Sequence, residues 1–270
     1  MLRNSSLEMR TNKMKIDYVS DIHINHYVHF KYNQLKWEKA TREWTRELLT
    51  TKEGEVLILA GDFSEWNVQT VWFIDECSKY YEKVYYTVGN HDYYLMSGSQ
   101  LNKYGNSKNR VNELKEDVSH LENVIPLDGC IDTYKGVIFA GHPLWYKLET
   151  EFERFWYKEN SNDSRKIFYQ EGYKESHELL YEESMEFYNS LDGIDIDVFV
   201  SHIPPMDPPF SNYQYNACYV APVPFLVGKH WVCGHQHVCG EFELHGTQFH
   251  MNPLGYPGET TFGKIQSFEI

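Results

Sequence analysis

Short apolar runs that alternate with longer amphipathic stretches constrain the fold of this chain most strongly. The runs are rich in β-branched and aromatic residues, and each ends in a polar or glycine-containing loop, a pattern typical of buried strands. They cover residues 15–20, 56–60, 84–88, 137–141, 197–201 and 231–233. Helical periodicity marks residues 35–50, 67–82, 108–120 and 165–190. This alternation predicts a layered α/β architecture.

The two ends of the chain and one internal segment depart from that alternation. Residues 241–252 form two short runs about a His-Gly pair, which predicts a β-hairpin and a second sheet. Residues 1–13 precede the first strand and are expected to be a disordered extension, so that residues 14–270 form a single domain. We interpret the aromatic and acidic segment at about 145–190 as a helical cap inserted in that domain.

Five of the strand-like runs end in side chains that bind metal ions. In an open α/β sheet the carboxyl ends of the parallel strands share one edge, where binding sites assemble. Seven donors are expected to meet there: Asp21, His23, Asp62, Asn90, His202, His235 and His237. Carboxylate, amide and imidazole ligands suit Mn, Fe, Zn or Ni rather than Ca. Seven donors exceed the needs of one tetrahedral zinc, so two ions that share a carboxylate fit better.

Two pairs of these donors are separated by a single residue. Asp21 and His23 form one pair, His235 and His237 the other, and in extended backbone alternate side chains point to the same face. Each pair is therefore expected to be able to reach one ion. Glycines precede several of the donors and permit tight turns beside bulky ions.

The ordered blocks 21-DIH-23, 61-GD-62, 89-GNHD-92, 201-SH-202 and 234-GHQH-237 resemble the calcineurin-like metallophosphoesterases. The pattern of that family is D-x-H, G-D, G-N-H-[DE], an isolated His and G-H-x-H, and all five blocks occur here in order. The resemblance implies an α/β (α+β) fold, a four-layer αββα sandwich of two mixed β-sheets flanked by helices. Residues 1–13 and the stretch from about 145 to 195 carry none of the motifs.

The resemblance also implies a role for each residue. One metal ion would be held by Asp21, His23 and His237. The other would be held by Asn90, His202 and His235. Asp62 would bridge the two ions. His91 would donate a proton to the leaving oxygen or stabilise the transition state, and Asp92 would orient His91.

The implied activity is that of a hydrolase acting on ester bonds, a phosphatase or phosphodiesterase. Two divalent ions, with Mn the expected choice in vitro, would supply a bridging hydroxide that attacks a phosphate mono- or diester. The substrate would be a phosphorylated small molecule, a nucleotide or a protein. Two alternatives stay open: a nuclease acting on DNA or RNA, and a non-catalytic binding protein of the same fold. The second predicts missing ligands, and all seven are present.

The composition of the chain limits its expected binding partners and its expected cellular compartment. Lys and Arg total 25 against 39 Asp and Glu, a formal net charge of -14 that disfavours nucleic acid as a partner. The sequence has no apolar run long enough for a membrane span and no secretion signal at its start. Its five cysteines form no CxxC pair. A cytoplasmic protein with buried thiols is therefore expected.

Two further features near the middle of the chain are candidates for substrate binding. His142, in 141-GHPLWY-146, is considered for a contact with the substrate, and the aromatic residues of 145–157 for stacking on a nucleobase. Packing is the commoner role for aromatic residues at helical spacing. The histidines outside the five blocks receive no site assignment.

Overall fold

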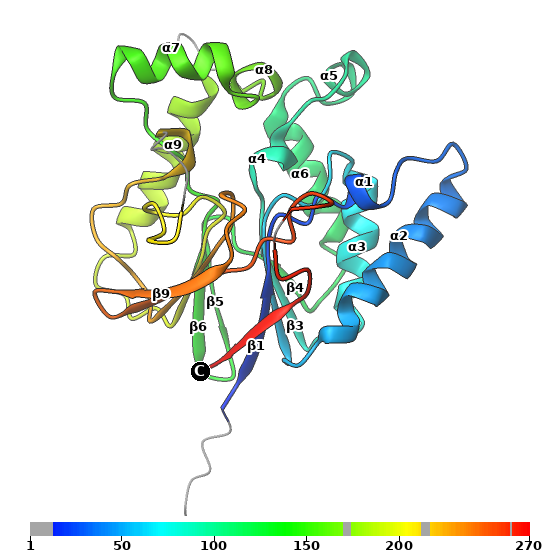
Figure 1. The fold of residues 1–270 in the computed structure, drawn as a ribbon, viewed down its shortest axis with the longest axis horizontal. Helices are drawn as coiled ribbons and strands as arrows, with labels where there is room; N and C mark the ends of the chain where they lie inside the picture. Colours follow the sequence, from blue (N-terminus) through cyan, green and yellow to red (C-terminus); the bar gives the residue numbers. More distant parts are fainter. Residues whose placement is uncertain (1–12, 170–173, 212–216, 260) are drawn as a thin grey trace, which may run out of the picture.

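The computed structural model describes residues 13–169, 174–211, 217–259 and 261–270. Within these ranges two β-sheets pack face to face, and helices cover the outer face of each (Figure 1). This arrangement confirms the predicted four-layer sandwich. The predicted N-terminal extension lies, apart from Lys13, outside the described residues.

The first sheet has the strand order β11-β1-β2-β3-β4. Its parallel strands are β1 (Lys15–Val19), β2 (Val56–Ala60), β3 (Lys83–Thr87) and β4 (Val124–Pro126), and β11 (Gln266–Glu269) pairs antiparallel with β1. The outer face is covered by α2 (Gln34–Leu48), α3 (Asn67–Ser78) and α6 (Ser107–Val118) (Figure 1). These helices match three of the predicted ones.

The second sheet has the strand order β5-β6-β7-β8-β10-β9. Its parallel strands are β6 (Val137–Gly141), β7 (Val198–Val200), β8 (His230–Cys233) and β10 (Thr247–Met251). Two antiparallel strands, β5 (Cys130–Tyr134) and β9 (Gly240–Leu244), form its edges. The β9-β10 hairpin turns at the His-Gly pair, as predicted. Helix α9 (Ser176–Asn189) packs on this sheet through Tyr188, whose ring contacts Phe199 and Trp231.

Strand β2 shows why the two sheets stack. All five of its side chains are buried; Val56, Ile58 and Ala60 belong to the core between the sheets, and Leu57 and Leu59 to the core beneath the helices. A parallel strand covered on both faces is apolar along its whole length. This explains why such strands are visible as continuous apolar runs in the sequence.

The remaining elements are short. They are α1 (Ile24–Tyr27), α4 (Asn90–Tyr93), α5 (Gly98–Tyr104), α7 (Glu151–Asn160), α8 (Asp163–Lys166) and the 3-10 turns Leu49–Thr51 and Ala217–Tyr219. Helices α7 and α8 stand above the carboxyl ends of the strands (Figure 1). The predicted helix 165–190 corresponds to the end of α8 and to α9, with residues 170–173 outside the described part.

Two remaining expectations concern thiols and membranes. Cys77, Cys218 and Cys233 are buried, whereas Cys130 and Cys239 are partly exposed, so the expectation of buried thiols was wrong for these two. Cys130 lies on an edge strand, where one face meets solvent. Among the described residues no helix has the length and apolar character needed to cross a bilayer.

Candidate metal centre

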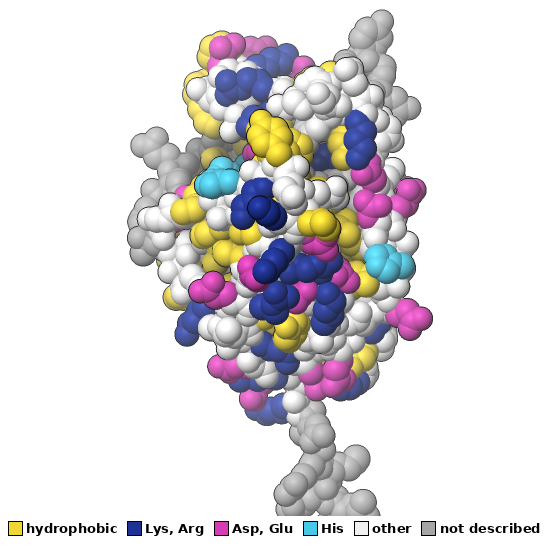
Figure 2. Space-filling model, turned by 90° about the vertical axis from the view of Figure 1, so that its right-hand side faces the viewer, with side chains coloured by type: hydrophobic (Ala, Val, Ile, Leu, Met, Phe, Trp, Pro, Cys, Tyr) yellow, Lys and Arg dark blue, Asp and Glu magenta, His cyan; other side chains and the backbone are white. Residues whose placement is uncertain are grey.

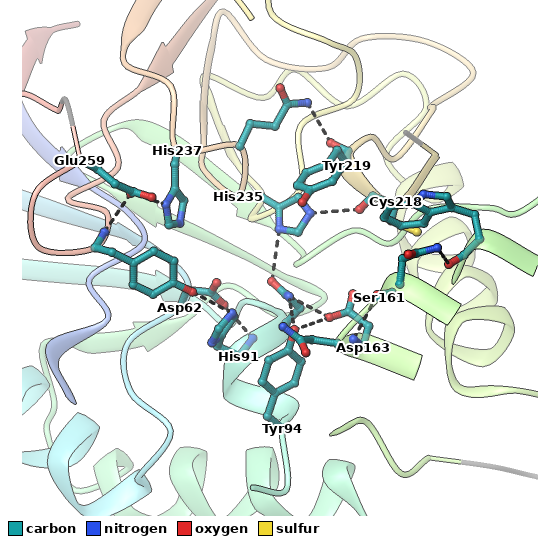
Figure 3. Close-up of a pocket in the computed structure, with 16 residues that line it drawn as sticks. Asp62, His91, Tyr94, Ser161, Asp163, Cys218, Tyr219, His235, His237 and Glu259 are labelled. Carbon is teal, nitrogen blue, oxygen red and sulfur yellow. Dashed lines mark hydrogen bonds and ion pairs between the residues drawn. The ribbon is translucent and has the colours of Figure 1, made fainter. Parts of the chain in front are cut away.

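The parallel strands of both sheets end beside one pocket of about 290 Å³ (Figure 3). Asp62 follows β2, Asn90 begins α4 directly after β3, and His235 and His237 follow β8, and all four side chains line the pocket. Segments far apart in the sequence therefore deliver their polar side chains to the same edge, as expected for parallel strands.

The backbone of these loops is unusual. Eight described residues other than glycine adopt a left-handed conformation, with φ between 43° and 70°. Five of them are predicted metal ligands: Asp21, His23, Asp62, His235 and His237. Such residues are uncommon, cost of order 1–3 kcal/mol each when strained, and cluster at functional sites. The donor pairs thus converge through left-handed turns beyond the strand ends, so the expectation of extended backbone was wrong here.

Two glycines make room for the carboxylates. A β-carbon on Gly89 would overlap Oδ1 of Asp62, and one on Gly234 would overlap Oδ2 of Asp21. Neither glycine has a positive φ. The space beside the carboxylates, rather than an unusual backbone angle, therefore requires glycine at these two positions.

Asp21, His23 and His237 form the first group of donors. The Nε2 atoms of the two histidines lie 3.1 Å apart, and Nε2 of His237 lies 3.4 Å from Oδ1 of Asp21. Two ligands bound at about 2.1 Å to one ion, at angles between tetrahedral and octahedral, are roughly 3.0 to 3.4 Å apart. The spacing of the first group therefore fits a single ion.

Asn90, His202 and His235 form the second group. Oδ1 of Asn90 lies 3.1 Å from Nε2 of His202 and 3.2 Å from Nδ1 of His235. These separations again match two ligands of one ion. The structure thus brings both predicted groups together, with His235 and His237 on different sides of the centre (Figure 3).

Asp62 lies between the two groups. Its Oδ2 is 3.7 Å from Nε2 of His23 and 3.5 Å from Nε2 of His202, and its Oδ1 accepts a hydrogen bond from the backbone N–H of His91 at 2.8 Å. Burial opposes the charge of Asp62, but its contact with His202 outweighs burial and holds its pKa well below the usual range. One carboxylate oxygen is therefore shared by both groups.

Three of the four imidazoles are held by their second ring nitrogen. Nδ1 of His202 lies 2.8 Å from the carbonyl oxygen of Ala60, and Nε2 of His235 lies 3.0 Å from that of Cys218. Nδ1 of His237 lies 2.7 Å from a carboxylate oxygen of Glu259. Since these acceptors require the proton on the facing nitrogen, the other nitrogen of each ring is the one that can bind a metal ion once it has lost its proton. The donor set therefore fits divalent transition metals.

Opposite charges dominate the metal-free centre. Burial lowers the pKa of His202, but Asp62 outweighs burial and raises it to about 10. Burial likewise opposes the charge of Asp21, and contact with His237 lowers its pKa to about 2. These carboxylates are therefore ionised, as oxygen ligands must be.

His91 and Asp92 occupy different surroundings. His91 lines the pocket, and its ring centre lies 4.7 Å from that of His23. Burial lowers the pKa of His91 to about 3, so the ring is neutral in the metal-free molecule. The carboxylate of Asp92 accepts hydrogen bonds from the backbone N–H groups of Gly89, Asp62 and Phe63 at 2.8, 2.9 and 3.2 Å. Among the described residues Asp92 thus joins the two loops instead of orienting His91, contrary to expectation.

Glu259 and Tyr256 were not singled out in the sequence. Tyr256 stacks on the ring of His23 at 4.4 Å, and its hydroxyl lies 3.4 Å from Nε2 of His91. Glu259 holds His237, as described above. Both belong to a loop after β10 that contains none of the five blocks, so no spacing rule pointed to them.

We expect Glu259→Ala to weaken binding of one Mn²⁺ ion roughly 10- to 100-fold, the usual effect of removing an outer-shell partner of a metal-binding histidine. Turnover at saturating Mn²⁺ should stay near normal, because no ligand atom is removed. Calorimetric titration measures the affinity, and Glu243→Gln, on the exposed face of β9, serves as control. Unchanged affinity for both ions would show that Glu259 does not support His237.

The two weaker sequence features have separate outcomes. His142 is buried, stacks on Phe187 and accepts a hydrogen bond from the N–H of Leu144 at 3.2 Å, and it does not line the pocket. Trp145 is buried in the core. Trp156, in α7, does line the pocket. Packing therefore accounts for Trp145, whereas Trp156 is placed to touch a bound molecule.

Fold and centre together define a class of proteins, the metal-dependent phosphoester hydrolases. The family model "Calcineurin-like phosphoesterase" matches residues 14–239. Because this match covers well over half of the chain, the protein belongs to the calcineurin-like phosphoesterase family. The predicted family and the predicted enzyme class, a hydrolase of phosphoesters, are thereby confirmed.

One solved structure supports the fold assignment. Phosphopantetheinyl hydrolase from Mycobacterium tuberculosis superimposes with a TM-score of 0.68 at 15% sequence identity, covering 95% of this chain and 96% of that one. The calcineurin-like phosphoesterase YfkN from Bacillus subtilis gives a TM-score of 0.44 at 13% identity, covering 96% and 90%. The first likeness shows a shared fold. A search of curated proteins gives no match.

Proposed function

We propose that this protein hydrolyses the phosphate monoester of a small molecule, with two divalent ions bound on either side of Asp62. The observation that carries the proposal is the position of Oδ2 of Asp62, which faces Nε2 of both His23 and His202 at 3.7 and 3.5 Å. A carboxylate with one donor group on each side is suited to bridge two ions.

Each residue of the centre would have a separate role in metal binding or catalysis. The first group would hold one ion and the second group the other, and bound ions of this kind activate water and stabilise the phosphoryl oxygens. Mn, Fe, Zn and Ni all suit the donor set. His91, beside His23 in the pocket wall, would donate a hydrogen bond to the departing oxygen. Asp92 would keep the loops that carry Asp62 and Asn90 in register through its three backbone contacts.

The pocket favours a small substrate. Its volume is about 290 Å³, and residues of the segment between β6 and β7, among them Trp156, Ser161 and Asp163, form one wall. We propose that this segment acts as the cap inferred from the sequence. A phosphate at the end of a small molecule fits such a space, whereas a phosphodiester within a polymer needs a groove open at both ends.

Charge argues against a nucleic-acid substrate. The pocket residues include Asp62, Asp163 and Glu259 but neither Lys nor Arg among the described ones. On the face formed by α2 and α3, Figure 2 shows Lys and Arg side chains interspersed with acidic ones. Arg42, for example, pairs with both Asp75 and Glu76. Cations neutralised in this way are poorly suited to binding phosphate backbones.

We expect the purified protein to contain close to two transition-metal ions per chain and, in Mn²⁺, to hydrolyse an aryl phosphate monoester at least about tenfold faster than the matching diester. A chelator should abolish turnover and added Mn²⁺ should restore it, because the two ions would supply the attacking hydroxide. Elemental analysis and a chromogenic assay measure both quantities. One ion per chain or fewer, or turnover in chelator, would refute the two-ion proposal. Preference for the diester would refute the monoester assignment alone.

A further inference from the structure

Asp163 lies at the start of α8 and reaches the metal centre indirectly. Its side chain is buried, with 4% of the residue exposed. Its Oδ1 accepts hydrogen bonds from Nδ2 of Asn90 at 2.9 Å and from the hydroxyl of Tyr94 at 2.5 Å (Figure 3). Its Oδ2 accepts one from the hydroxyl of Tyr146 at 2.7 Å. The carboxylate is thus held by three donors.

The contact with Asn90 fixes the direction of an amide. Nδ2 of Asn90 can only donate hydrogen bonds, and it points to Asp163 and to the hydroxyl of Tyr94 at 2.9 Å. Oδ1 therefore points the other way, toward the ring nitrogens of His202 and His235. A flipped amide would place its carbonyl oxygen against the carboxylate and its N–H groups in the position of a metal ligand. The first contact is repulsive, and the second would deprive the proposed ion of its oxygen ligand.

We propose that Asp163 is a positioning residue for the second metal site: it fixes the amide of Asn90 so that Oδ1 is presented to the ion. This inference rests on the proposed function, because it assigns Asn90 to a metal ion. It also makes the segment between β6 and β7 part of the centre, although that segment carries none of the five sequence blocks. Asp163 orients the amide of Asn90 and contributes no ligand atom of its own.

Other contacts keep Asp163 in place. Tyr146 is fully buried and lies in the same inserted segment, and Tyr94 directly follows α4, which begins with Asn90. The backbone N–H of Asp163 donates to Oγ of Ser161 at 3.1 Å. The carboxylate is therefore fixed from its own segment and from the loop that it orients, which is the arrangement that an outer-shell residue needs.

The test compares two replacements of Asp163 in the full-length protein. In Asp163→Ala the amide of Asn90 loses its acceptor, and we expect the affinity of one Mn²⁺ ion to fall roughly 10- to 100-fold while the other ion binds as in the wild type. In Asp163→Asn the new amide can turn its oxygen to Asn90 and its NH₂ group to the hydroxyl of Tyr146. We expect that variant to bind both ions within a few-fold of the wild type. Calorimetric titration with Mn²⁺ is the readout.

A paired substitution separates the effect of the orientation of the Asn90 amide from a general loss of protein stability. Asn90→Asp alone places two carboxylates against each other and should weaken the binding of one Mn²⁺ ion. Asn90→Asp combined with Asp163→Asn supplies an N–H donor between the two side chains again and should restore that binding. Glu159→Gln, exposed on α7, is the control and should match the wild type. The double variant keeps the test valid if Asp163→Ala does not fold.

Clear results would overturn the inference. The first is an unchanged affinity for both ions in Asp163→Ala. The second is an equal loss of affinity for both ions, together with a lower melting temperature, in both replacements of Asp163. The third is a double variant whose affinity does not recover. Failure of the wild-type protein itself to bind two Mn²⁺ ions would instead refute the proposed function, so the two failures can be told apart.

Discussion

Replacement of Asp62 by asparagine is expected to reduce the hydrolysis of an aryl phosphate roughly a thousandfold or more, the equivalent of several kcal/mol of transition-state stabilisation. The new side chain has the same shape and can still accept the hydrogen bond from the N–H of His91 through Oδ1. It loses the negative charge, and its NH₂ group would face the ring nitrogens of His23 and His202. Both proposed sites are affected, which is why this change should have the largest effect.

The Asp62→Asn experiment combines turnover of an aryl phosphate in Mn²⁺ with elemental analysis of the same sample. We expect a loss of bound metal together with the loss of turnover, since one oxygen faces both groups of donors. Asp195→Asn, at an exposed position before β7, is the matched control and should behave as the wild type. Turnover within tenfold of the wild type, at unchanged metal content, would exclude a bridging role.

Much of the fold could be predicted from the sequence, because its central strands are buried on both faces. The runs at 56–60 and 137–141 coincide with β2 and β6. The strands that were missed lie at or near the sheet edges, and β5 alternates between half-buried and exposed residues. A half-exposed edge strand has no continuous apolar run, so periodicity alone cannot separate it from a loop.

The centre was predictable only in part, for a similar physical reason. Residues that occur in fixed spacing, such as His235 and His237, can be read from the sequence. Glu259 and Asp163 contact the site through side chains brought near only by the fold, 22 residues after His237 in one case and 73 residues after Asn90 in the other. The left-handed backbone of Asp21 and His23 was also hidden, because both residues are compatible with an extended chain.

Substitution of His91 by alanine is expected to lower turnover roughly 100- to 10,000-fold, the usual range for losing a group that transfers or shares a proton in the transition state, while metal content stays near two ions. The imidazole lines the pocket beside His23, and its Nε2 faces the hydroxyl of Tyr256 at 3.4 Å. If the ring donates to the departing oxygen, the loss should be greater for alkyl phosphates than for aryl phosphates, because an alkoxide is the poorer leaving group.

The geometry also offers a competing role, which the His91→Ala experiment separates. Donor atoms of His23, Asp62 and His91 all lie within 4.8 Å of one another, so His91 could itself hold an ion. Loss of an ion in His91→Ala, with rescue of turnover by excess Mn²⁺, would show that His91 is a ligand. The hydrogen-bond role requires the opposite: retained metal, no rescue and a defect that grows with the pKa of the leaving group. His120→Ala, on the exposed surface, is the control. Retained metal with a defect that depends on the leaving group would therefore assign His91 to the departing oxygen rather than to an ion.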